Sequence, residues 1–105
     1  MDRESETIAN EDDRLRQAAE LAEDNGANWS AAYAPGSFGC HELLDRTNLI
    51  GDLLEQQLLS HPACVANSEW YAQAAMAVAI LRELYQQIGA SHVAAETEEA
   101  ALASS

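Results

Sequence analysis

Two long stretches of the chain, residues 40–60 and 68–88, carry apolar side chains at the spacing of an α-helix. At about 100° per residue, the first stretch has a broad apolar arc, and its polar residues gather on the opposite face. The arc is made of Leu43, Leu44, Leu49, Ile50, Leu53, Leu54 and Leu58. Pro62 stops the helix, because proline lacks the amide hydrogen that a helix interior needs. The pattern predicts a first long helix over residues 40–60.

The second stretch follows Asn67, whose side chain can cap a helix, and precedes Gly89, a residue type that commonly ends one. Its apolar side chains form one stripe, and the alanines in that stripe would let a neighbouring helix approach closely. The stripe contains Trp70, Ala74, Ala77, Val78, Leu81, Leu84, Tyr85 and Ile88, with Met76 and Ile80 widening it. The pattern predicts a second long helix over residues 68–88.

A weaker helical pattern precedes these two. Asn10 can cap a helix whose first turn is acidic, and Asn25-Gly26 can end it, which predicts a helix over residues 10–24. Residues 27–39 contain a proline and two glycines and are expected to form a loop. The aromatic side chains of this loop, expected to pack back onto the helices, are Trp29, Tyr33 and Phe38.

Together the patterns predict an all-α fold built on an antiparallel helical hairpin of residues 40–60 and 68–88. The apolar arc of the first hairpin helix is wider than one neighbouring helix can cover. The N-terminal helix could cover part of it, and the hairpin of a second chain could cover more, so we expect a four-helix homodimer. The residues expected at this interface are Leu49, Ile50, Leu53, Trp70, Ala74, Ala77, Leu81 and Leu84.

The chain carries 18 acidic residues and five arginines, which gives a formal net charge of −13. This balance argues against direct binding of nucleic acid or of an anionic membrane surface, because both require cationic groups. Most of the charge lies near the two ends. We therefore divide the chain into an acidic N-terminal segment with a helix (1–26), a helical core (27–93) and a low-complexity tail of alanine and acidic residues (94–105).

The sequence also bears on the cellular compartment. Every apolar run is shorter than the roughly 20 residues of a membrane span, and the acidic N-terminus is unlike a signal peptide. A helix of 20 residues is about 30 Å long, so Cys40 and Cys64 would lie at opposite ends of the first hairpin helix. A disulfide needs Cα atoms within about 7 Å, so we expect two reduced thiols and a cytoplasmic protein.

One end of the predicted hairpin gathers the side chains with the greatest potential for chemistry. The returning helix brings His92 toward Cys40 and His41, and Asp45 lies one turn after His41. A helix N-terminus stabilises a thiolate, an imidazole can act as its base, and a carboxylate can orient that imidazole. The aromatic residues of loop 27–39 would then serve as lids. The alternative is structural, with a small buried cysteine, a polar helix face and a solvated histidine. No known motif frames the cysteine, so we favour the structural interpretation and expect no enzyme.

A metal or cofactor site has weaker support in the sequence. Structural zinc sites usually have paired ligands at C-x₂-C or H-x₃-H spacing, and neither spacing occurs. An antiparallel dimer could still place Cys40 and His41 near a second chain's copies of His61 and Cys64, a ligand set that zinc would accept. The chain has no glycine-rich phosphate loop and no calcium-binding loop, so no cofactor and no metal are expected.

Four short patterns between residues 39 and 89 add a resemblance. They are G-C-H-E at Gly39–Glu42, H-P at His61-Pro62, N-x-E-W at Asn67–Trp70 and L-Y-Q-x-I-G at Leu84–Gly89. With these patterns the segment resembles a set of small, uncharacterised helical proteins of bacteria and their phages. The resemblance spans about half of the chain, implies a helical hairpin and brings no activity with it.

Three functions are compatible with these patterns. We favour a non-enzymatic all-α protein that binds another protein and itself, because the apolar arc is wide and no catalytic set is assembled. The first alternative is an acidic inhibitor, such as a phage counter-defence protein, that mimics nucleic acid and blocks a nucleic-acid-binding protein. The second alternative is an enzyme or metal-binding protein centred on Cys40, His41 and His92.

Overall fold

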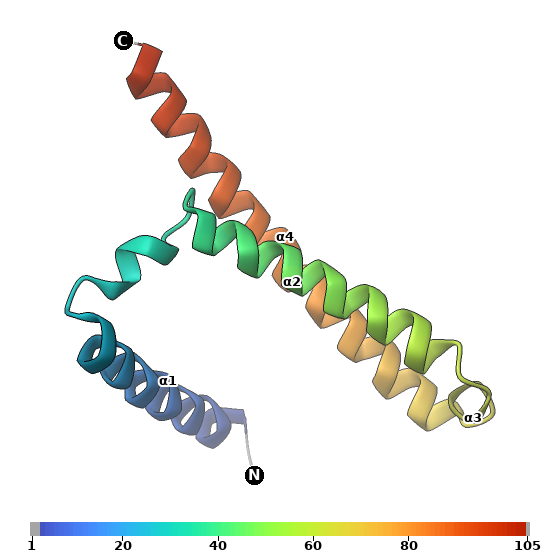
Figure 1. The fold of residues 1–105 in the computed structure, drawn as a ribbon. Helices are drawn as coiled ribbons and strands as arrows, with labels where there is room; N and C mark the ends of the chain where they lie inside the picture. The colour runs from blue at the N-terminus through green and yellow to red at the C-terminus, as the bar shows by residue number, and fades with distance from the viewer. Residues whose placement is uncertain (1–2, 105) are drawn as a thin grey trace. The chain divides into compact units, whose positions relative to one another are not determined.

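The computed structural model describes the backbone of residues 3–104 and the side chains of residues 6–99, and all regular structure in this part of the chain is helical (Figure 1). The elements in chain order are α1 (Arg3–Asn25), η1 (Trp29–Tyr33), α2 (Phe38–Leu54), η2 (Glu55–Leu59), α3 (Pro62–Val65) and α4 (Ser68–Ser104). The all-α prediction is therefore confirmed. None of these helices is long and apolar enough to cross a membrane.

The chain divides into two compact units, residues 1–33 with α1 and η1, and residues 34–105 with the remaining helices. In the second unit, α2 and α4 lie side by side along most of the length of α2, and the short α3 joins their ends (Figure 1). The chain reverses direction between them, so the pair is the antiparallel hairpin that the sequence predicts.

α1 is an exposed helix that ends where the sequence predicted. Gly26 follows Asn25 with a φ of 96° and donates its N–H to the carbonyl oxygen of Ala22 at 2.8 Å. The start differs from the prediction, because α1 already runs from Arg3 and Asn10 lies in its interior. Ion pairs between residues three apart support an exposed helix of this kind, so it needs no cap at Asn10.

The two hairpin helices begin at caps. Ser37 caps α2, which begins at Phe38, two residues before the start that the sequence predicted. α2 runs directly into η2, a π-helical segment, so helical backbone continues from residue 38 to residue 59. Asn67 caps α4 as predicted, because its Oδ1 accepts the N–H groups of Glu69 and Trp70, both at 3.1 Å.

The seam between α2 and α4 consists of positions alternately three and four residues apart, which is the spacing of a coiled coil. Its buried and half-buried residues are Cys40, Leu44, Thr47, Gly51 and Leu54 on α2, and Ala75, Val78, Arg82, Tyr85, Gly89 and His92 on α4. Two contacts define the register of the pair. Leu44 lies against Gly89, and Gly51, seven residues further along α2, lies against Arg82, seven residues earlier on α4. Small residues occupy much of the α2 side. The seam fixes the register but buries little apolar surface.

α4 is much longer than the predicted helix over residues 68–88. It passes through Gly89 without a positive φ and continues to Ser104. Two physical reasons explain why the glycine does not end it. Residues 90–104 are rich in alanine and glutamate, which are strong helix formers. The seam also continues beyond Gly89, since His92 packs beside the first turn of α2.

The expectation that the loop aromatics pack back onto the helices as lids is wrong for two of them. Phe38 is 80% exposed and Tyr33 is also exposed, whereas Trp29 is half-buried beside α1. Phe38 is the first residue of α2 and lies two positions before the seam residue Cys40, so its side chain projects away from the seam. Phe38 nevertheless lines a shallow cavity beside His41 and His92.

Candidate functional site

The open end of the hairpin, where α2 begins beside α4, holds the candidate site that the sequence predicted. Ser37 Oγ accepts the N–H of Cys40 at 3.1 Å, which fixes the first turn of α2 and turns Cys40 into the seam, where it is 7% exposed. His41 is the next residue and projects outward, with its ring centroid 5.6 Å from that of His92 on α4. The Nε2 atom of His41 lies 3.4 Å from Asp45 Oδ2, one turn along α2.

His92 is the centre of this end of the hairpin, and it is not the solvated residue of the structural interpretation. The side chain is buried, with only 3% of the residue exposed. Its Nδ1 accepts the N–H of Gly36 at 2.9 Å, a bond between residues that are 56 positions apart. Its Nε2 lies 3.1 Å from Oε1 of Glu96, one turn further along α4. The sequence did not single out Gly36 or Glu96.

The structure thus brings Cys40, His41, Asp45 and His92 to one end of the hairpin. Within the described residues, neither imidazole is hydrogen-bonded to the Cys40 thiol, and Nε2 of His92 is sealed from solvent. The side chain of His41, by contrast, is about half exposed. A shallow cavity of 310 Å³ lies at this end of the hairpin, lined by Gly36, Ser37, Phe38, His41, His92 and Glu96.

The structure gives little support to a metal site. Within residues 6–99, no three histidine, cysteine or acidic side chains are grouped closely enough to hold a metal ion. Cys40 and Cys64 are both free thiols, so the prediction that they do not pair is confirmed. The zinc site shared between two chains stays a prediction.

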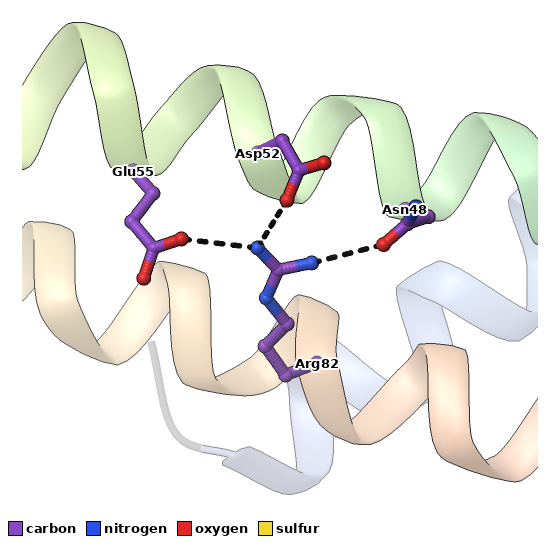
Figure 2. Close-up of polar contacts among 4 residues, drawn as sticks. All are labelled: Asn48, Asp52, Glu55 and Arg82. Carbon is purple, nitrogen blue, oxygen red and sulfur yellow. Dashed lines mark hydrogen bonds and ion pairs between the residues drawn. The ribbon is translucent and has the colours of Figure 1, made fainter.

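A polar cluster that the sequence did not predict joins the middle of the hairpin (Figure 2). Arg82 of α4 reaches across to α2, and its Nη2 contacts Asp52 Oδ1 at 2.6 Å and Glu55 Oε2 at 3.1 Å. Its Nη1 donates to Asn48 Oδ1 at 3.2 Å. Hydrogen bonding to Asp52 is the main reason that the pKa of Arg82 is raised, so the guanidinium keeps its charge. The sequence feature that could have indicated this cluster is Gly51, because a glycine in the middle of a helix leaves room for the Arg82 guanidinium in the seam.

The residues expected at a dimer interface lie mostly on the surface of the hairpin. Ile50 is 49% exposed and Trp70 is 58% exposed, although both are large and apolar. Leu49, Leu53, Ala77 and Leu84 are also exposed, and Ala74 and Leu81 are half-buried. The α4 stripe predicted from the sequence is therefore divided, because Val78 and Tyr85 face the seam while most of its other residues face outward.

Beside the seam, each of the two helices has a second set of residues at coiled-coil spacing, which faces outward. We call them the outer stripe: Leu43, Arg46, Ile50 and Leu53 on α2, and Trp70, Ala74, Ala77, Leu81, Leu84 and Ile88 on α4. In an antiparallel pair the two helices run in opposite senses, so the stripes beside the seam fall on the same side of the hairpin. The Arg82 cluster lies on the other side. The hairpin therefore has one apolar side and one polar side.

Comparison with protein-family models, curated proteins and solved structures finds no match to this chain. The function must be argued from the hairpin itself.

Proposed function

We propose that the chain is a non-enzymatic protein-interaction protein whose hairpin associates with the hairpin of a second copy to form a four-helix homodimer. The observation that carries the proposal is the outer stripe. Each helix of a four-helix bundle contacts two neighbours, so it needs two sets of positions at coiled-coil spacing. Both α2 and α4 have two such sets, and in each helix only one of them is used within the hairpin.

The thin seam supports the same proposal. The buried apolar residues among those described are Cys40 and Val78, and no large side chain is fully buried. Burial of apolar surface stabilises a protein by roughly 25 cal/mol per Å², so a seam of this size gives an isolated hairpin little stability. A second hairpin placed on the outer stripe would supply the missing core from side chains that are already at the correct spacing.

The charge distribution permits this association despite the net charge of −13. Asp52 and Glu55 lie on the polar side, where both contact Arg82. The charged residue within the outer stripe is Arg46, which pairs with Glu42 of its own helix at 2.9 Å. Two copies can therefore meet through a nearly neutral surface while their acidic residues face water.

Size-exclusion chromatography with light scattering tests the proposal. We expect the mass of a dimer for the wild-type chain, and the mass of a monomer for Ile50→Glu and for Leu84→Glu, because each change places a charge in the outer stripe. Val93→Glu is the matched control. Val93 is 57% exposed on α4 but lines a different surface with Leu44 and Gln86. A wild-type chain that stays monomeric at high concentration, or a control that dissociates like the two variants, would contradict the homodimer.

The alternatives receive less support. An acidic inhibitor would need free carboxylates at the spacing of phosphates, and Arg82 neutralises two of the acids on the polar side. A cysteine-centred enzyme would need a base next to its thiol, and within the described residues neither His41 nor His92 is hydrogen-bonded to Cys40. We further propose a cytoplasmic location, in keeping with two free thiols held far apart on the hairpin.

A further inference from the structure

The connector between the two compact units, residues 34–37, is held against α4 by a single histidine. Among the buried side chains of the described residues, His92 has the lowest exposure, 3%. Its Nδ1 accepts the N–H of Gly36 at 2.9 Å. Gly36 has a φ of 89° and lies close to α4. A Cβ at this position would stand 3.1 Å from Ala95 Cβ, so a residue larger than glycine would be crowded there. The connector and α4 therefore meet at one hydrogen bond and one close backbone contact.

The hydrogen bond fixes the tautomer of the neutral ring. An imidazole nitrogen that accepts an N–H carries no proton, so a neutral His92 has its proton on Nε2. That Nε2 lies 3.1 Å from Oε1 of Glu96, yet the two are not aligned as a hydrogen bond and the atom is sealed from solvent. A ligand in the neighbouring cavity could not reach it. A proton is the species whose arrival changes this site.

We propose that His92 is a proton-operated latch on the connector. Neutral His92 holds Gly36 through Nδ1. When a proton from solvent binds Nδ1, two donors face each other across the same 2.9 Å, so the bond to Gly36 is lost and the connector leaves α4. The imidazolium then pairs through Nε2 with the carboxylate of Glu96, which already lies next to it. The new N–H is the one covalent bond formed, and no covalent bond in the chain is broken.

The groups around His92 set the direction of the pH dependence. Glu96 favours the charged ring, and His41, at 5.6 Å, opposes it whenever His41 is itself charged. Asp45 faces His41 and offsets that charge, while Cys40 and Glu42 are further titratable groups at this end of α2, Glu42 being paired with Arg46. The closed latch binds one proton fewer than the open latch, so it is stabilised as the pH rises and opens as the pH falls.

The opening frees residues 34–36 from α4. Ser37 still caps α2 through Cys40, so the hairpin itself stays intact. The latch does not depend on the proposed homodimer. It is a property of one chain, and it can be measured in a monomeric variant such as Leu84→Glu as well as in the wild type.

Hydrogen exchange of the Gly36 amide tests the latch directly. We expect its protection factor, corrected for the intrinsic pH dependence of exchange, to fall roughly fivefold between about pH 8 and about pH 5.5, the factor expected for loss of one hydrogen bond. The fall should follow the protonation of His92 in its imidazole nitrogen chemical shifts. Unchanged protection of Gly36 while His92 becomes protonated would overturn the proposal.

Three variants separate the latch from general acid effects. His92→Gln keeps a hydrogen-bond acceptor but does not titrate, so the fall in Gly36 amide protection between high and low pH should vanish. His61→Gln is the matched control, because His61 Nδ1 also accepts a backbone N–H, that of Ala63 at 3.1 Å, but on the exposed turn. In His61→Gln, the fall in Gly36 protection with decreasing pH should equal that of the wild type. Gly36→Ala, which forces the connector off α4, should show low protection at every pH. A fall in Gly36 protection that survives His92→Gln, or that disappears in His61→Gln, would refute the latch.

Discussion

At the scale of single residues, a polar cluster aligns the hairpin. Arg82 occupies a seam position on α4, where its guanidinium contacts Asn48 and Asp52 of α2 and Glu55 at the start of η2. Gly51 makes this possible, because a Cβ there would stand 3.0 Å from Arg82 Nη1. Long apolar side chains can slide past one another by a turn, but an arginine with three fixed acceptors cannot. The cluster therefore sets the register in the way that buried polar residues do in coiled coils.

The first prediction concerns the charge of this cluster. Arg82→Met keeps most of the side-chain length but leaves Asp52 and Glu55 without their cation, three residues apart on one helix. We expect a lower urea midpoint, measured by circular dichroism at low salt. In the background Asp52→Asn with Glu55→Gln, the same arginine change should have a much smaller effect. An equal loss in both backgrounds would mean that packing of the side chain, and not pairing of charges, holds the helices in register.

At the scale of helices, the sequence was a good guide to where α1 ends and where α4 begins, because Asn25-Gly26 and Asn67 act locally as caps. It was a poor guide to where α4 ends. Gly89 has the local signature of a helix end, yet the seam continues past it to His92. A tertiary contact overrides a local preference here, and the pattern of a single segment does not contain that contact.

The same limit explains what could be predicted of the candidate site. Antiparallel packing of two helices was enough to place His92 near Cys40 and His41. The bond from Gly36 depends on the path of the connector, and a loop path is not written in helical periodicity. Helical spacing also could not decide which of two adjacent stripes on α4 faces α2. Both stripes have coiled-coil spacing, and the arrangement of Arg82 against Gly51 selects between them.

The second prediction compares the two glycines of the seam. Both lie inside helices, where alanine is favoured over glycine by roughly 0.5–1 kcal/mol. At Gly89 a Cβ would meet Leu44 Cδ1 at 3.6 Å, an ordinary contact, so Gly89→Ala should raise the free energy of unfolding by about that amount. Gly51→Ala should gain less or lose stability, because its Cβ would displace the Arg82 guanidinium. Urea denaturation measures both. Equal stabilisation by the two substitutions would show that the guanidinium moves aside freely.

At the scale of the whole molecule, the two compact units divide the acidic charge between them. Residues 34–105 contain nine acidic residues and two arginines, so each unit carries about half of the net charge of −13. The contacts of α2 are with α4 and with the turn between them. The hairpin unit therefore has its own seam, its own caps and its own outer stripe, and all the features that we propose for self-association lie within it.

The final prediction follows from that division. A chain of residues 34–105 retains Gly36 and Ser37, which hold the start of α2, so it should fold with the helix content expected for the hairpin alone. If the outer stripe pairs with a second copy, this shorter chain should have the mass of a dimer in light scattering, as the full chain does. It should also dimerise more tightly at low salt, because removal of residues 1–33 removes like charge from each copy. A dimeric full chain whose shortened form is monomeric would instead mean that residues 1–33 take part in the interface. Where the shortened chain is a dimer, Ile50→Glu should dissociate it, because the change places a charge in the outer stripe.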